Sequence, residues 1–158
     1  MSEKVVNYLF YSLIVFILLG VSYAYIQGKK QNEVFKADYQ EYQIALKLID
    51  QGGNSQSISI LEKQAEKYPD RYNILHKLGL SYAQAGDWGK AVHYYQRAID
   101  QRPFLQMDPV FTMQFAEILF FNNEYVKARA YLEKSKQLPG SERFGPRIEE
   151  LLTAITKN

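Results

Sequence analysis

The sequence contains no cysteine and only two histidines, His76 and His93. The absence of cysteine excludes disulfide bonds, thiolate zinc sites and a cysteine nucleophile. Two histidines that lie 17 residues apart do not make a metal cage, so we expect no metal site and no cofactor. A glycine-rich phosphate loop, a nucleophile elbow and an H-E-x-x-H motif are also lacking, and no catalytic residue is predicted.

Positive and negative charges nearly cancel, because the formal net charge is only +2 in 158 residues. Residues 1–30 carry this excess, and the rest of the chain is neutral. A nucleic-acid-binding surface is therefore not expected. The chain is instead rich in aromatic residues, with 13 tyrosines and nine phenylalanines. An aromatic, neutral body without catalytic motifs indicates a binding module rather than an enzyme.

One long uncharged stretch of 24 residues, Val5 to Gly28, lies near the N-terminus. As a helix it would be about 36 Å long, enough to cross a hydrocarbon core of about 30 Å. Tyrosines, which favour the membrane–water interface, lie near both of its ends: Tyr8, Tyr11, Tyr23 and Tyr25. We predict that residues 1–30 form an N-terminal membrane anchor.

The alternative is a cleavable signal peptide, for which Ser22-Tyr23-Ala24 offers a cleavage pattern. The length of the stretch and its tyrosines favour an uncleaved anchor. The lysines that follow it, Lys29, Lys30 and Lys36, favour a cytosolic body, whereas the very short N-terminal tail favours export. We predict a single-pass protein of a bacterial inner membrane with an extracytoplasmic body, and the cytosolic face is the alternative.

A helical repeat is predicted for most of the remaining chain. Its clearest unit runs from Tyr72 to Leu105 and places small and large apolar residues at fixed positions: Leu75, Leu78, Gly79, Tyr82, Ala91, Tyr95, Ala98 and Pro103. This pattern resembles the tetratricopeptide repeat, a helix–turn–helix unit of 34 residues. Related residues recur 34 positions earlier and 37 positions later: Ala45, Leu48, Leu61 and Pro69, then Ala116, Leu119, Ala128 and Leu132.

The turns between paired helices agree with this register. Gly86 and Asn123 precede Trp88 and Tyr125 by two residues, and both residue types tolerate the left-handed conformation that ends a helix. Gly52-Gly53-Asn54 is the corresponding turn of the first unit. The three additional residues before the last unit are expected within 104–108.

The predicted fold is therefore all-α. An anchor (1–30) precedes a tetratricopeptide domain (31–145) with repeats at about 38–71, 72–105 and 109–142. A capping helix (146–158) follows, in which Ile148, Leu151, Leu152 and Ile155 share one face.

The resemblance implies a binding groove, because the first helices of the repeats line a concave surface in this family. The positions of this chain expected to bind a partner there are Tyr39, Tyr42, Leu46, His76, Leu80, Met113, Glu117, Phe120 and Phe121. The lysines and asparagines with which one branch of the family holds a C-terminal carboxylate are missing, so an apolar or amphipathic segment is expected. The alternative interpretation is that several of these side chains simply pack against one another. Glu117 is the only evident ion of the set, so charge is expected to matter little.

Three functions fit these predictions. The first is a membrane-anchored scaffold or assembly factor that binds a partner protein. The second is a fixed accessory subunit of a larger membrane complex, with the anchor helix as an interface. The third is an enzyme whose site is not visible in the sequence, and the lack of motifs disfavours it. An organelle import receptor would also fit if the body were cytosolic.

Overall fold

The computed structural model describes residues 3–52 and 55–157, and these residues form helices and short connections without any strand. The all-α prediction is thus confirmed for this part of the chain. The elements are α1 (Glu3–Asp50), α2 (Ser55–Lys67), α3 (Tyr72–Gln84), α4 (Trp88–Gln101), the 3-10 helix η1 (Pro103–Met107), α5 (Pro109–Phe121), α6 (Tyr125–Lys136), the 3-10 helix η2 (Glu142–Phe144) and α7 (Gly145–Lys157).

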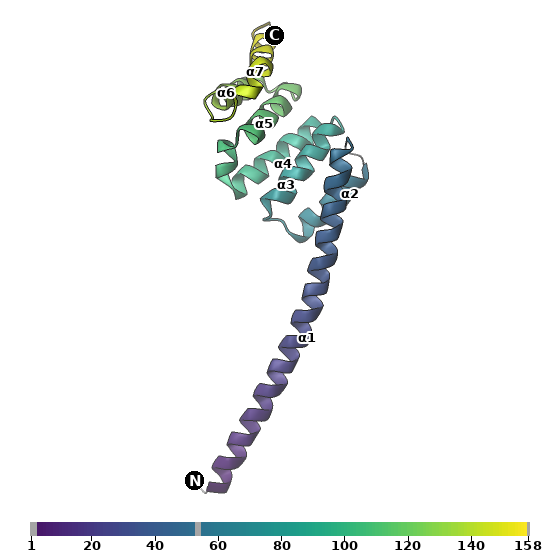
Figure 1. The fold of residues 1–158 in the computed structure, drawn as a ribbon, viewed down its shortest axis with the longest axis vertical. Coiled ribbons are helices and arrows are strands. Elements are labelled where there is room, and N and C mark those ends of the chain that lie inside the picture. The colour runs from purple at the N-terminus through teal and green to yellow at the C-terminus, as the bar shows by residue number, and fades with distance from the viewer. Residues whose placement is uncertain (1–2, 53–54, 158) are drawn as a thin grey trace. The chain divides into compact units, whose positions relative to one another are not determined.

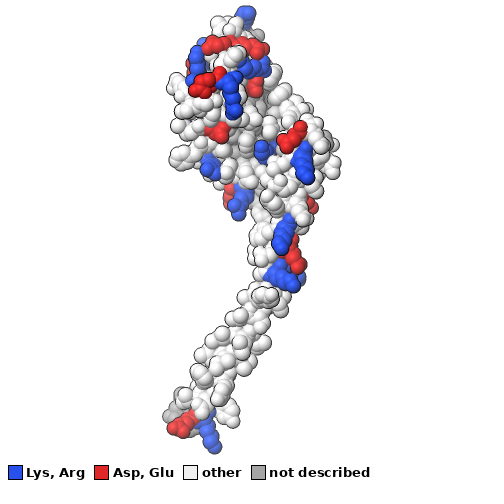
Figure 2. Space-filling view, viewed as in Figure 1, with Lys and Arg blue, Asp and Glu red and all other residues white. Residues whose placement is uncertain are grey.

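The chain divides into two compact units, Met1–Glu41 and Tyr42–Asn158, and the division falls within α1. In the first unit the large apolar side chains between Val5 and Ile26 are exposed. Figure 2 shows this stretch as uncharged atoms on the face drawn, with charged residues only before and after it. Among the described residues, α1 is the one helix long and apolar enough to cross a membrane, a test that signal sequences also meet.

The second unit is a stack of antiparallel helix pairs. α3 packs against α4 and α5 packs against α6, while α2 contacts α3, α4 contacts α5, and α7 contacts both α5 and α6. Figure 1 shows these helices following one another along the unit in chain order. The core runs through all of them, from Ala45 and Ile49 of α1 to Ile155 of α7.

The turns adopt the conformation expected from the sequence. Gly86 has φ of 79° and Asn123 has φ of 61°, which confirms both predicted left-handed positions. The amide that follows each of them donates back to the preceding helix, from Asp87 to Tyr82 and from Glu124 to Leu119. Gly52 also has a positive φ, 104°, whereas Gly53 and Asn54 of the same predicted turn lie outside the described residues.

Close packing of α3 on α4 depends on small residues. A Cβ atom added to Gly79 would lie 2.6 Å from Cδ2 of Tyr95 and 3.3 Å from the carbonyl oxygen of Ala91. Both of those residues are fully buried. The ring of Tyr95 is stacked on Phe115 of the next hairpin, with ring centroids 5.4 Å apart. Tyr95 therefore connects its own hairpin to the next one.

The second and third hairpins are joined by η1, which covers most of 104–108, the stretch in which three additional residues were predicted. Asp108 ends this connection and caps α5, since its Oδ1 accepts from the amides of Val110 at 2.8 Å and Phe111 at 3.0 Å. Such a cap satisfies amides that have no partner within the helix. At the far end of the stack, α7 buries Ile148, Leu151 and Ile155.

Candidate functional site

Two pockets lie along the surface shared by α3 and α5, the first helices of the second and third hairpins. The first, which we call the Trp88 pocket, has a volume of about 280 Å³. It is lined by Leu80, Ala83, Gln84, Trp88, Gln114, Glu117, Ile118 and Phe121. The structure thus brings together Leu80, Glu117 and Phe121, which were predicted as binding residues.

One wall of the Trp88 pocket is aromatic. The indole of Trp88 stacks on Phe121, with centroids 4.8 Å apart and planes inclined by 23°. Phe121 remains 42% exposed despite this contact. Trp88 was not predicted as a binding residue because the sequence placed it only in a turn. It is the sole tryptophan of the chain, so its fluorescence reports on this pocket alone.

The second pocket, which we call the Phe104 pocket, has a volume of about 360 Å³. It is lined by Tyr72, His76, Arg102, Phe104, Leu105, Asp108, Val110 and Phe111. Only His76 of these residues is among the partner-binding residues predicted above. The rest come from the beginnings of α3 and α5 and from the η1 connection, a segment outside the repeat pattern. Arg102 lies over the ring of Tyr72 at 4.7 Å, so a basic group is present at this end of the surface in addition to the predicted Glu117.

A polar bridge between α3 and α5 adjoins both pockets. Nε2 of His76 lies 3.3 Å from Oε1 of Gln114, which also accepts a hydrogen bond from the hydroxyl of Tyr95 at 3.1 Å. The imidazole meets the rings of Tyr95 and Phe111 edge to face, at 5.1 and 4.9 Å. Because an amide oxygen only accepts, Nε2 of His76 carries the proton in this bridge.

Burial sets the charge state of the bridge. Loss of solvation, aided by the positive charge of Lys77, lowers the pKa of His76 to about 4. Burial likewise raises the pKa of Tyr95, which keeps its hydroxyl protonated. The bridge is therefore neutral near pH 7, and it joins two hairpins rather than presenting a charge to a partner.

Glu117 is paired within the fold. Its Oε1 accepts from Nε of Arg147 on α7 at 2.7 Å, and Arg147 also contacts Glu150 at 2.8 Å. The one ion predicted for the groove is thus balanced by a cation from the capping helix. Since both side chains are partly exposed, the pair mainly neutralises this end of the surface.

The remaining predicted residues are placed differently. Met113 is only 3% exposed and belongs to the core, so it does not offer a surface to a partner. Tyr42 and Leu46 are half-buried against the core, and the hydroxyl of Tyr42 lies 3.5 Å from Nδ2 of Asn73 on α3. Tyr39 is 63% exposed and lies in the other unit. Phe120 packs edge to face on Phe121 and Tyr125, as the alternative packing interpretation expected.

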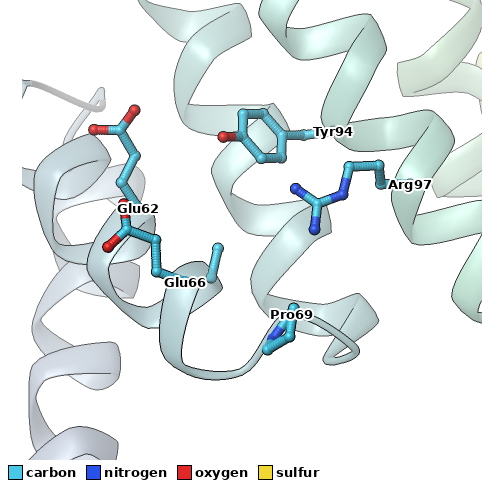
Figure 3. Close-up of a pocket in the computed structure, with 6 residues that line it drawn as sticks. Glu62, Glu66, Pro69, Tyr94 and Arg97 are labelled. Atoms are coloured by element: carbon cyan, nitrogen blue, oxygen red, sulfur yellow. The ribbon is translucent and has the colours of Figure 1, made fainter.

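A third pocket of about 380 Å³ lies between α2 and α4 and is mostly polar. Figure 3 shows Glu62 and Glu66 on one side of it and Tyr94 and Arg97 on the other. Tyr94 is stacked on Tyr82, with centroids 5.6 Å apart. The carboxylate of Glu62 accepts from the hydroxyl of Tyr82, so this polar group of the pocket is paired within the fold.

In the described part of the chain, no group of three or more His, Asp or Glu side chains lies close enough together to hold a metal ion. His93 is exposed on α4 beside Tyr94.

Residues 72–104 match the family model for the tetratricopeptide repeat. Similar solved structures include the Yersinia enterocolitica type III secretion translocator chaperone SycD, at 19% identity and a TM-score of 0.63 over 75% of this chain and 82% of that one. SycD in complex with a peptide of the translocator YopD is 20% identical, with a TM-score of 0.61 over 75% and 91% of the two chains. At this identity the likeness concerns the fold. A comparison with curated proteins found no match.

Proposed function

We propose that this chain, whose residues 72–104 match the tetratricopeptide-repeat model, is a membrane-anchored module that binds an apolar or amphipathic segment of a partner protein in the groove between α3 and α5. The observation that carries the proposal is the Trp88 pocket, where Leu80, Ile118 and Phe121 surround a hollow next to the only tryptophan. A concave site lined by aromatic and aliphatic side chains typically binds a segment that buries apolar anchor residues in it.

The fold likeness supports a protein ligand rather than a small substrate. The similar SycD structure holds a peptide of the translocator YopD, and we extend to this chain only the use of the repeat surface for a peptide. A few buried anchors would be enough for micromolar affinity, about 8 kcal/mol of binding free energy.

Membrane anchoring by residues 5–28 is part of the proposal. Its support is the exposed, uncharged stretch of α1. We propose a bacterial inner membrane with the repeat unit on the extracytoplasmic side. Alkaline phosphatase fused after Asn158 tests the side, since activity equal to an exported control is expected and an inactive fusion at normal expression would place the body in the cytosol. The mass of the purified chain tests whether the anchor is retained.

Photo-crosslinking tests the groove. A crosslinking amino acid at Phe121 is expected to capture a defined partner band in living cells. The matched control is Val126, which is 86% exposed on α6 and lines none of the three described pockets. Equal crosslinking at both positions would argue against a groove-specific partner. A stoichiometric partner that persists through purification would favour the fixed-subunit role over the assembly factor.

A further inference from the structure

We infer that the segment bound in this groove is extended rather than helical, and that it places one apolar side chain in the Trp88 pocket and another, four residues away, in the Phe104 pocket. This inference rests on the proposed function and specifies its ligand. It also assigns a carboxylate on the segment, next to the anchor in the Phe104 pocket, to pair with Arg102.

The two pockets are separate subsites on the same pair of helices. His76 belongs to the Phe104 pocket and Gln114 to the Trp88 pocket, and their side chains meet at 3.3 Å. The bridge of His76 and Gln114 therefore separates the two pockets, and we call it the saddle. A continuous apolar trough would accept the stripe of a helix, whereas two hollows with a polar saddle match separated anchors.

The spacing of the anchors follows from the helices that line the pockets. On α3 the Phe104 pocket uses Tyr72 and His76, and the Trp88 pocket uses residues from Leu80 to Gln84. With a rise of 1.5 Å per residue, the pocket centres lie roughly 10–13 Å apart along α3 and α5. An extended chain advances about 3.3 Å per residue and returns to the same face at every second residue, so positions i and i+4 cover this distance.

The saddle has polar groups that suit an extended backbone. Gln114 uses Oε1 for both of its hydrogen bonds, and its Nε2 has no protein partner among the residues described. Because Nε2 of His76 carries the proton, Nδ1 of the same ring is an acceptor. An extended segment has free amides and carbonyls that pair with these two groups. The middle of a helix has none, so a helix would cover both groups without satisfying them.

Charge fixes which end of the segment is acidic. Arg102 bonds to the hydroxyl of Tyr72 and has no carboxylate partner among the described residues. Asp108 of the same pocket uses its Oδ1 to accept from the amides at the start of α5 and makes no ion pair with Arg102 among the described contacts, and Glu117 is paired with Arg147. The exposed guanidinium of Arg102 is therefore the cation of the groove that a ligand carboxylate would complement.

A displayed library of random 12-residue peptides, panned on the full chain in detergent, tests the inference. Enriched peptides are expected to share two apolar residues at i and i+4 and an Asp or Glu beside one of them. A synthetic peptide of this kind, titrated while Trp88 fluorescence is followed, should bind at least tenfold more weakly when one residue is inserted between the anchors. Val110→Glu and Phe121→Glu, each at an exposed edge of one pocket, should each weaken binding at least tenfold, whereas Val126→Glu should leave it unchanged.

The charge assignment has its own variant. Arg102→Glu is expected to reverse the preference from an acidic to a lysine-containing peptide. Peptides that need the groove but share a seven-residue apolar spacing, or a single anchor, would overturn the extended two-anchor inference while the proposed function stands. Peptides whose binding survives both Val110→Glu and Phe121→Glu in folded protein would refute the groove itself, and with it the proposed function.

Discussion

Replacing Gly79 with alanine is expected to destabilise the repeat unit, although alanine is the better helix former. The new Cβ would lie 2.6 Å from Cδ2 of Tyr95 and 3.3 Å from the backbone oxygen of Ala91. Tyr95 has no room to retreat, because it is fully buried, stacked on Phe115 and hydrogen-bonded to Gln114. Overpacking of this kind costs about 1–3 kcal/mol.

The net effect is smaller than the steric cost. Alanine gains about 0.8–1 kcal/mol over glycine inside a helix, so the two contributions leave a net loss between about zero and 2 kcal/mol. The 2.6 Å approach to the ring of Tyr95 favours the upper half of that range. Gly89 provides the matched control, since it also lies in a helix and an added Cβ would meet nothing closer than 3.9 Å. Gly89→Ala is expected to be neutral or stabilising by a few tenths of a kcal/mol.

Thermal unfolding of the full chain, followed by circular dichroism in one mild detergent, measures both variants. With roughly 3–6 °C per kcal/mol for a unit of this size, Gly79→Ala should unfold several degrees below the parent and Gly89→Ala at or slightly above it. A Gly79→Ala protein that is as stable as Gly89→Ala would refute the close packing of α3 on α4 around Tyr95.

Three further substitutions test other parts of the packing. Ala91→Leu should cost at least about 1–3 kcal/mol by overpacking the same helix pair, and an unchanged melting temperature would mean that the repeat register is wrong. His76→Phe removes a histidine whose pKa is about 4 in the fold and about 6.5 when unfolded. Because the unfolded state binds the proton first as the pH falls, the free energy of unfolding of the parent should decrease by up to about 3 kcal/mol more than that of the variant between pH 7 and pH 4. Parallel pH profiles of urea unfolding would contradict this. Ser135→Ala removes a buried hydroxyl that has no hydrogen-bond partner among the described residues, so the midpoint of the variant in urea should stay the same or rise. A loss above about 1 kcal/mol would show that the hydroxyl is satisfied.

The repeat itself was predictable because its determinants are local. The small residues Gly79 and Ala91 and the turn residues Gly86 and Asn123 act within one hairpin, at spacings that the sequence displays directly. The left-handed conformations of the two turn residues followed from residue type alone.

The site was less predictable because its features depend on contacts between hairpins. Met113 has the spacing of a groove residue but turns into the core. Periodicity does not reveal this on α5, because apolar residues lie on nearly all sides of that helix. Arg147 reaches Glu117 from 30 residues away. The Phe104 pocket depends on η1, which interrupts the repeat pattern and therefore gave no signal.

The measurement that tests the central claim most directly is partner recovery by the double variant Leu80→Glu with Phe121→Glu, compared with Val126→Glu. The two groove residues line the Trp88 pocket, and Val126 is exposed outside it. Circular dichroism first shows equal helix content and similar melting, and the partner that co-purifies with each protein is then quantified without crosslinking. The groove account predicts that the double variant loses the partner and that Val126→Glu retains it. Full recovery by a folded double variant would contradict the account and make the anchor helix or the outer face of the repeats the binding surface.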